Sequence, residues 1–147
     1  MLSRTDLFNG MHKAINHHNR FVEIFGQFAR LAEQQMTPKQ RGFQGLEIGA
    51  LIDDVYFDAQ IAGRTIRFVL ATALTASDPI ANVLCSVRYL LPDATFADVS
   101  SFQFDRGGNA SIDDEHGKKC VLNDADCVDV LIQHHVLLAL HVAPKFS

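Results

Sequence analysis

The chain has no tryptophan, only three cysteines and four prolines, and no long uninterrupted apolar run. Three cysteines without metal-type spacing complete neither a disulfide framework nor a zinc knuckle, so we expect neither and favour a reducing cytoplasm. Its apolar runs fall far short of the ~20 residues of a membrane span. Because the N-terminus also lacks the apolar segment of a signal peptide, we expect neither insertion nor export.

The chain does have ample material for a core. Of its 147 residues 48% are hydrophobic, and eleven of these are phenylalanine. A chain of this length buries roughly 70% of its unfolded surface, which is enough for one core. With no internal repeat, low-complexity tract or linker, residues 1–147 are expected to form one domain that folds without a metal or a disulfide staple.

Charge is unevenly distributed along the chain. The net charge is −4. Residues 1–45 carry six basic groups against three acidic ones, whereas residues 46–147 carry seven against fourteen. Nucleic-acid binding needs clustered Lys and Arg, so the acidic C-terminal two-thirds disfavours a nucleic-acid partner. The same charge would attract a basic protein.

The first segment predicts a long helix. Ser3 is a helix cap, with Asp6 in the position of the capping-box acid. Apolar positions then follow one helical face: Leu7, Met11, Ile15, His18, Val22, Phe25, Ala29, Ala32 and Met36. Further apolar residues widen this face in its second half, which we expect to be the more deeply buried. Residues 16–19 are weak helix formers where the helix could break, and Thr37-Pro38 ends the pattern.

The central segment changes to a period of two, the mark of strands. Residues 55–61 and 66–72 flank an Ala62-Gly63 turn and predict a hairpin. Further strands are expected over residues 83–91 and 95–104. A glycine turn at residues 106–109 leads into residues 110–112, an acidic loop follows at residues 113–117, and a short strand at residues 119–122 closes the meander.

The last segment predicts a second helix, capped by Asn123 or Asp124. Its expected apolar face comprises Cys127, Val130, Leu131, Leu137, Leu138 and Val142. The order of helix, strands and helix is segregated, which favours an α+β fold over a parallel one. We therefore expect an antiparallel β-meander of four to six strands, with the N-terminal and C-terminal helices on one sheet face.

Histidines and cysteines are the tempting catalytic or metal-binding residues. His17 and His18 on the first helix could meet His134 and His141 on the last, but no His-x-x-x-His pair places two ligands on adjacent turns. Exposed histidines explain the pattern better. Cys85 and Cys127 fall among apolar positions and are expected to be small buried hydrophobes, and no Gly-x-Ser-x-Gly motif is present.

The acidic and glycine-rich segments also have simple interpretations. Asp53-Asp54 and Asp113-Asp114-Glu115 could hold a cation or act as acid and base, but a solvated turn is favoured for both. Residues 105–109 lack the Lys-Ser/Thr pair of a phosphate loop and are interpreted as a hairpin turn. No catalytic constellation, metal site or cofactor site is therefore predicted.

In architecture and charge the chain resembles a known family. A Phe-rich helix from Leu7 to Leu31, a meander, a hairpin from Phe102 to Ala110 and a closing helix from Asp126 to Leu140 look like the immunity proteins of bacterial contact-dependent growth inhibition systems. The resemblance implies a cytoplasmic protein that binds and neutralises a cognate toxin domain, often a basic nuclease. No shared motif assigns a role to any residue.

The predicted partner-binding residues come from the charge pattern instead. Seven carboxylates fall at strand ends and loops of the sheet, where a rigid scaffold could present them to a cationic surface: Asp53, Asp54, Asp58, Asp105, Asp113, Asp114 and Glu115.

Two alternatives stay open. One is a small enzyme or ligand-binding domain whose pocket, between curved sheet and helix, is reached by His18 or His134. The other is an oligomeric adaptor that pairs through a sheet edge.

Overall fold

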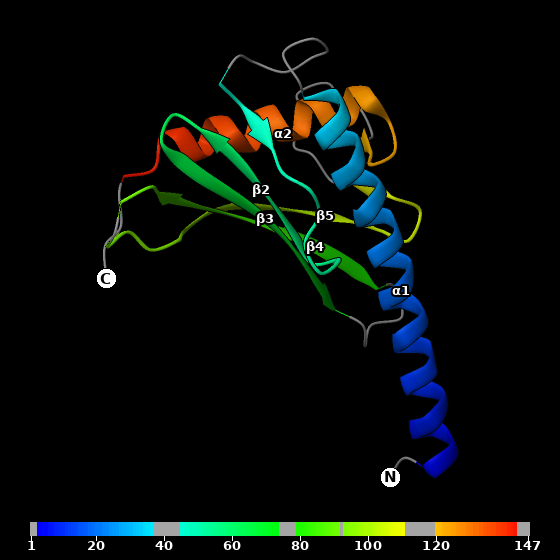
Figure 1. Cartoon of the computed structure of the whole chain (residues 1–147). Coiled ribbons are helices and arrows are strands. Elements are labelled where there is room, and N and C mark those ends of the chain that lie inside the picture. The colour runs from blue at the N-terminus through cyan, green and yellow to red at the C-terminus, as the bar shows by residue number, and fades with distance from the viewer. Residues whose placement is uncertain (1–2, 37–44, 74–78, 92, 111–119, 144–147) are drawn as a thin grey trace.

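The computed structural model describes residues 3–36, 45–73, 79–91, 93–110 and 120–143. It confirms the α+β class: two helices accompany a seven-stranded antiparallel sheet whose strand order follows the chain (Figure 1). The elements, in chain order, are α1 (Arg4–Gln35), β1 (Glu47–Ile48), β2 (Tyr56–Ile61), β3 (Arg64–Ala73), β4 (Ile80–Tyr89), β5 (Ala97–Phe104), β6 (Asn109–Ala110), β7 (Cys120–Val121) and α2 (Ala125–Leu140).

The predicted hairpins are confirmed. β2 and β3 flank Ala62 and Gly63, which have the positive φ values of 50° and 72° that a tight turn requires. β6 and β7 are the short strands expected after the glycine turn. β1 was not expected, because a two-residue strand is too short to show a period. The predicted acidic loop at residues 113–117 lies outside the described residues.

Helix α1 is continuous. The reciprocal hydrogen bonds of Ser3 and Asp6 form the expected capping box, and the Ser3 hydrogen bonds lower the pKa of Asp6. The possible break at residues 16–19 does not occur. His17 within this stretch and Phe21 just after it are buried, and tertiary packing of this kind outweighs weak helix propensity.

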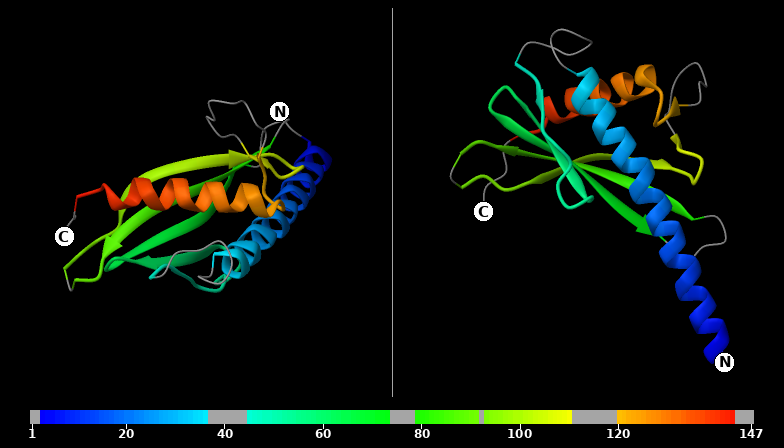
Figure 2. Two further views of the ribbon diagram at one scale, coloured as in Figure 1. Left: turned by 90° about the horizontal axis from the view of Figure 1, so that it is seen from above. Right: turned by 45° about the vertical axis from the view of Figure 1, so that its right-hand side comes forward.

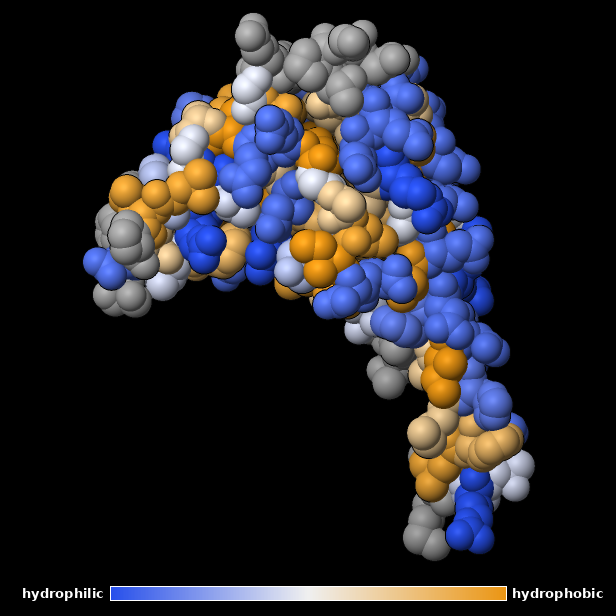
Figure 3. Space-filling model, viewed as in Figure 1, coloured by the Kyte–Doolittle hydropathy of each residue, from blue (hydrophilic) through white to orange (hydrophobic). Residues whose placement is uncertain are grey.

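The two halves of α1 have different surroundings. Residues 4–16, here called the arm, extend away from the rest of the molecule, whereas residues 17–35, the anchored half, lie against it (Figure 2). Four apolar side chains of the arm are between 53% and 67% exposed: Leu7, Phe8, Met11 and Ile15. Figure 3 shows hydrophobic patches along the arm, mainly on its left edge in this view, which is the side on which the sheet lies.

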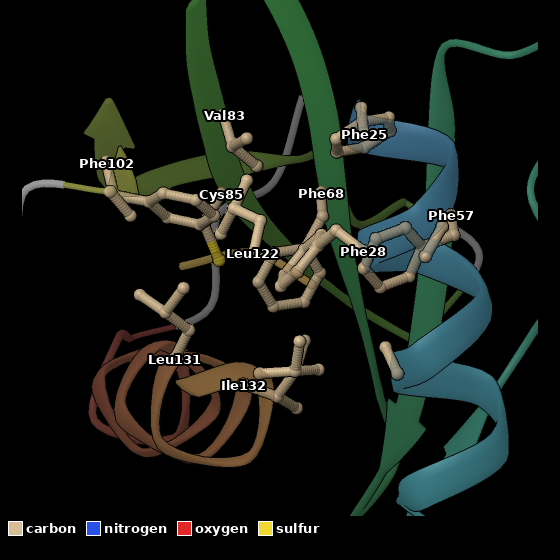
Figure 4. Close-up of a cluster of buried hydrophobic side chains, with 14 of the residues drawn as sticks. Phe25, Phe28, Phe57, Phe68, Val83, Cys85, Phe102, Leu122, Leu131 and Ile132 are labelled. Atoms are coloured by element: carbon tan, nitrogen blue, oxygen red, sulfur yellow. The ribbon is translucent and has the colours of Figure 1, made fainter. Parts of the chain in front are cut away.

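Both helices cover the same face of the sheet, as expected. Phe57, Phe68 and Phe102 project from β2, β3 and β5 into the core (Figure 4). Phe28 of α1 contacts the rings of Phe57 and Phe102, each with centroids 5.7 Å apart. From α2, His135 contacts Phe68 and Phe102. One layer of helices therefore seals one side of the sheet.

The predicted buried face of α2 was partly wrong. Cys127 and Leu131 are buried, but Val130, Leu137 and Leu138 are exposed. The residues that are buried in their place are Val128, Ile132, His135, Val136 and Ala139. Apolar residues surround α2 on nearly all sides, so periodicity alone could not select the face that meets the sheet. Its cap is Asp124, which accepts a hydrogen bond from the Asp126 amide.

The expectation for the cysteines also needs correction. Cys120 and Cys127 form a disulfide, with Cα atoms 5.2 Å apart, that joins β7 to the first turn of α2. An odd cysteine count excludes a complete framework but still permits one bridge. Cys85 is the small buried hydrophobe that was expected, and burial raises the pKa of its thiol to about 12.

Within the described residues, neither helix has a stretch that is both long and apolar enough to cross a membrane.

Candidate functional site

The sheet face opposite the helices presents a cluster built around Arg67. Side chains alternate along each strand, so Tyr56 and Asp58 project away from the core that Phe57 enters. Register then places Asp58 directly opposite Arg67 of β3. The guanidinium of Arg67 donates to both carboxylate oxygens of Asp58, at 2.9 and 3.0 Å. This bidentate pair fixes the guanidinium on the sheet surface.

Two aromatic rings flank the same guanidinium. Its central carbon lies 4.2 Å from the ring centroid of Tyr56 and 4.6 Å from that of Phe96. Arg88 approaches Phe96 at 5.1 Å. Hydrogen bonding to Asp58 raises the pKa of Arg67. We call Tyr56, Asp58, Arg67, Arg88 and Phe96 the Arg67 cluster.

The Arg67 cluster is suited to binding rather than to proton transfer. Arginine and aromatic side chains are enriched at the energetic centres of protein interfaces. Here the stacking and the ion pair already hold Arg67 in place, so little side-chain entropy remains to be lost on binding. Arg67 and Asp58 are both only part-buried, which leaves the cluster accessible.

The predicted carboxylates have different local roles. Asp58 is neutralised by Arg67, as described above. Asp105 accepts hydrogen bonds from the amides of Gly107 and Asn109, so it holds the β5–β6 turn that was expected there. The predicted residues Asp113, Asp114 and Glu115 lie outside the described part of the chain.

Asp53 and Asp54 lie together in the turn before β2. Both are exposed and have left-handed backbones, with φ values of 52° and 58°. With α1 they line a cleft of about 270 Å³, here called the aspartate cleft: His18, Asn19, Val22, Asp53, Asp54, Val55 and Leu70. The structure therefore brings His18 to two predicted carboxylates. Asp105 lies elsewhere, because its turn contacts α1 through Arg20, on the opposite flank from His18.

The second predicted histidine lines a different cavity. His134 and Gln133 border an apolar pocket of about 460 Å³ between α2 and the β1–β2 edge, completed by Leu46, Ile61, Val136, Leu137 and Leu140. His18 and His134 thus do not converge. Among the described residues, no three His, Cys, Asp or Glu side chains lie close enough to hold a metal ion.

A buried polar contact was missed by sequence reasoning. The Ser100 hydroxyl and Nδ1 of His135 share a hydrogen bond of 2.6 Å between β5 and α2. Ser100 pairs with Cys85 and alternates with the buried Phe102 and Phe104, so its side chain faces the core. Burial, and then the charge of His134, lower the pKa of His135 to about 4, so the ring is neutral near pH 7. Its spacing of four residues from Leu131 was the available signal for the buried face of α2.

The expectation of exposed histidines is wrong for His17 of α1, which is buried, whereas His18, His134 and His141 are exposed. The Nε2 atom of His17 has no hydrogen-bond partner among the described residues. Burial, followed by the charges of Arg106 and Lys13, lowers the pKa of His17. Both buried histidines therefore favour the neutral form and belong to the packing of the helices.

Comparison with protein-family models, curated proteins and solved structures finds no match to this chain.

Proposed function

We propose that this chain is a non-catalytic binding protein that neutralises a cognate bacterial toxin domain. The observation that carries the proposal is the Arg67 cluster on the sheet face that the helices leave uncovered. A rigid sheet supports it, two aromatic rings order it, and solvent reaches it. These are the properties of an interface centre.

The acidic excess of residues 46–147, rather than the charge of the Arg67 cluster itself, supports a basic partner. Strand register continues from Arg67 through Ser86 to Asp98, so the exposed carboxylate of Asp98 lies on the same face as Asp58. The excess of acidic residues in positions 46–147 would speed the approach of a cationic domain. Association should accordingly slow as salt is added, because salt screens this attraction.

A cytoplasmic location is part of the proposal, and it has a redox consequence. Glutathione and thioredoxin keep most cytoplasmic thiols reduced, whereas Cys120 and Cys127 are bridged in the structure. In that compartment the protein must bind its toxin with the bridge open. Binding should therefore survive a reducing agent, and loss of binding on reduction would contradict the cytoplasmic assignment.

The test pairs the protein with a defined toxin domain. If the gene immediately upstream encodes a large secreted protein with a variable C-terminal toxin region, that region is the domain to use. We expect a 1:1 ratio in calorimetry and restored growth when both are co-expressed. Absence of a complex would overturn the proposal.

Two substitutions locate the interface. Arg67→Ala removes the anchor and should weaken binding about 30-fold, the effect of a hot-spot residue. Arg67→Lys keeps the charge but loses the bidentate geometry, so it should also weaken binding. Arg30→Ala, an exposed arginine on α1, is the matched control and should bind normally. Equal affinity of Arg67→Ala and the unmodified protein would remove the Arg67 cluster from the interface.

The acidic loop is tested separately. Charge reversal of Asp113, Asp114 and Glu115 together should weaken binding without unfolding the protein. Unchanged affinity would exclude this loop from the interface.

The alternative of a small enzyme or ligand-binding domain has two observations in its favour: the apolar pocket beside His134 and the aspartate cleft, where His18 lies with Asp53 and Asp54. The described lining of the apolar pocket has a histidine but no carboxylate, so it lacks an acid–base pair. In the aspartate cleft all three titratable side chains are exposed, so the cleft does not exclude water from them as an active site would. We therefore prefer the protein-binding function.

A further inference from the structure

We propose that two copies of this chain form a symmetric dimer in which their arms pair antiparallel and each arm tip enters the aspartate cleft of the other copy. The proposal is independent of toxin binding, because it concerns a different surface. The Arg67 cluster and the aspartate cleft share no residue.

The composition of the arm is that of a helix that is stable only when its apolar side packs against another element. An isolated helix of about 12 to 15 residues is marginal in water, and Asn9, Gly10 and Asn16 lower its propensity further. Its four apolar side chains are nonetheless more than half exposed, although the Phe8 ring contacts the ring of His12 on the next turn. Large contiguous apolar surface of this kind marks an interaction site.

The spacing of the apolar residues specifies a helical partner. Phe8, Met11, Ile15, His18 and Val22 are separated by alternating steps of three and four residues. This is the seven-residue repeat of a coiled-coil seam. The seam continues into the anchored half at Phe25, where the chain's own sheet buries it. In the arm the same seam remains uncovered.

One antiparallel register satisfies the whole seam. If Met11 faces Ile15 of the second copy, two-fold symmetry also places Phe8 opposite His18 and Arg4 opposite Val22. Each seam position then meets a seam position of the other helix. The contact is self-complementary, so it closes as a dimer and leaves no unpaired arm.

Charge complementarity selects the second copy over an unrelated helix. Val22 lines the aspartate cleft, so this register delivers Arg4 of one copy to Asp53 and Asp54 of the other. No described residue forms an ion pair with either aspartate. The second copy thus supplies the cation that the cleft lacks.

The surface available is sufficient for a specific dimer. Val55 lines the cleft and Ile52 directly precedes Asp53 in the chain; both are also exposed, at 43% and 41%. Together with the four arm side chains they expose on the order of 600 Å² in each copy, and the charged rim brings this near the roughly 800 Å² per partner of a standard interface.

The first experiment measures the oligomeric state of the full chain. Light scattering on size-exclusion fractions, loaded from about 1 to 100 μM, should show a species of twice the 16.3 kDa chain mass. Met11→Lys places a charge in the seam and should weaken the dimer at least about tenfold. Leu137→Lys, a similarly exposed apolar residue on α2, is the matched control and should not. Circular dichroism confirms that each variant is folded.

The second experiment tests the register and the cleft. Arg4→Asp and Asp54→Arg should each weaken the dimer, and the double variant should regain most of the lost affinity. A mixture of Met11→Cys and Ile15→Cys chains should form an intermolecular disulfide on oxidation, because the register makes these positions neighbours.

Several outcomes would overturn the proposal. They are a monomer at every concentration, a dimer disrupted by Leu137→Lys but not by Met11→Lys, and a double charge variant that stays as weak as either single one. A monomer at every concentration would mean that the arm does not bind a second copy and would point to a different partner. Disruption by Leu137→Lys alone would place the dimer interface on α2. None of them bears on the binding of the toxin domain, which is measured separately.

Discussion

The two halves of α1 obey the same sequence pattern but have opposite surroundings. In the anchored half, Phe21, Phe25 and Phe28 are fully buried against the sheet and α2. In the arm, Leu7, Met11 and Ile15 also recur at the helical period and are more than half exposed. Periodicity therefore identifies the apolar face of a helix, but it does not show which part of that face is buried within the chain itself. That distinction can be tested by making matched changes in both halves.

The largest expected difference comes from the phenylalanines. Phe28→Ala empties a site between Phe25, Phe57 and Phe102 and should lower the free energy of unfolding by about 3–5 kcal/mol. Phe8→Ala removes the same atoms from an exposed position and should change it by less than about 0.5 kcal/mol. Urea unfolding at a concentration too low for dimers measures both. Equal losses would show that the arm is part of the monomer's folding unit.

A second difference comes from acid. Lowering the pH should reduce the free energy of unfolding, because protonation of the buried His135 disfavours the core that also contains the anchored half. The pKa of His135 is about 4 in the folded chain and about 6.5 when unfolded, so between these values the unfolded chain binds a proton that the folded chain does not. The contribution is fully present above pH 6.5. It is lost as pH falls towards 4, at a cost of about 3 kcal/mol.

Urea unfolding across this pH range isolates the contribution of His135. His135→Gln retains a hydrogen-bonding group but cannot titrate, so the variant should show a shallower decline in stability than the unmodified chain. His134→Gln changes an exposed neighbour and should keep most of the decline. If His135→Gln loses stability as steeply as the unmodified chain, the buried ring is not the cause.

The smallest expected difference comes from two helical glycines. A Cβ at Gly26, in the anchored half, would make only ordinary contacts with Arg30 and Leu51, at 3.8 and 3.9 Å, and one at Gly10, in the arm, would meet nothing. Gly26→Ala should therefore raise the global free energy of unfolding by up to about 1 kcal/mol. Gly10→Ala should instead slow hydrogen exchange within the arm alone, since the arm can fray without unfolding the body. A global gain from Gly10→Ala would contradict the division of α1.

Much of the fold could be predicted because its signals are local. The capping box at Ser3, the turn at Ala62 and Gly63 and the cap at Asp124 are each encoded by neighbouring residues. The buried face of α2 could not be predicted, because its apolar residues surround the helix. The Cys120–Cys127 bridge was also missed, since spacing and parity do not show which β7 residue meets α2.

The candidate site depends more on contacts distant in the sequence. Asp58 was expected at the sheet surface, but its pairing with Arg67 depends on the β2–β3 register. The Phe96 ring that stacks on Arg67 comes from a segment after β4, so sequence spacing does not reveal this contact. His18 meets Asp53 and Asp54 only because α1 packs beside their turn. Such long-range contacts carry no sequence period. Charge alone therefore predicts the carboxylates but not their surroundings.

The simple strand order has a consequence for how the chain acquires its shape. Every sheet pairing joins segments that are neighbours along the chain, so the sheet can grow by short loop closures, which cost little entropy. The packing of α1 against α2 instead joins the two ends of the chain. During synthesis α1 is made first, and we expect its phenylalanines to stay partly exposed until α2 has been made and can complete the core.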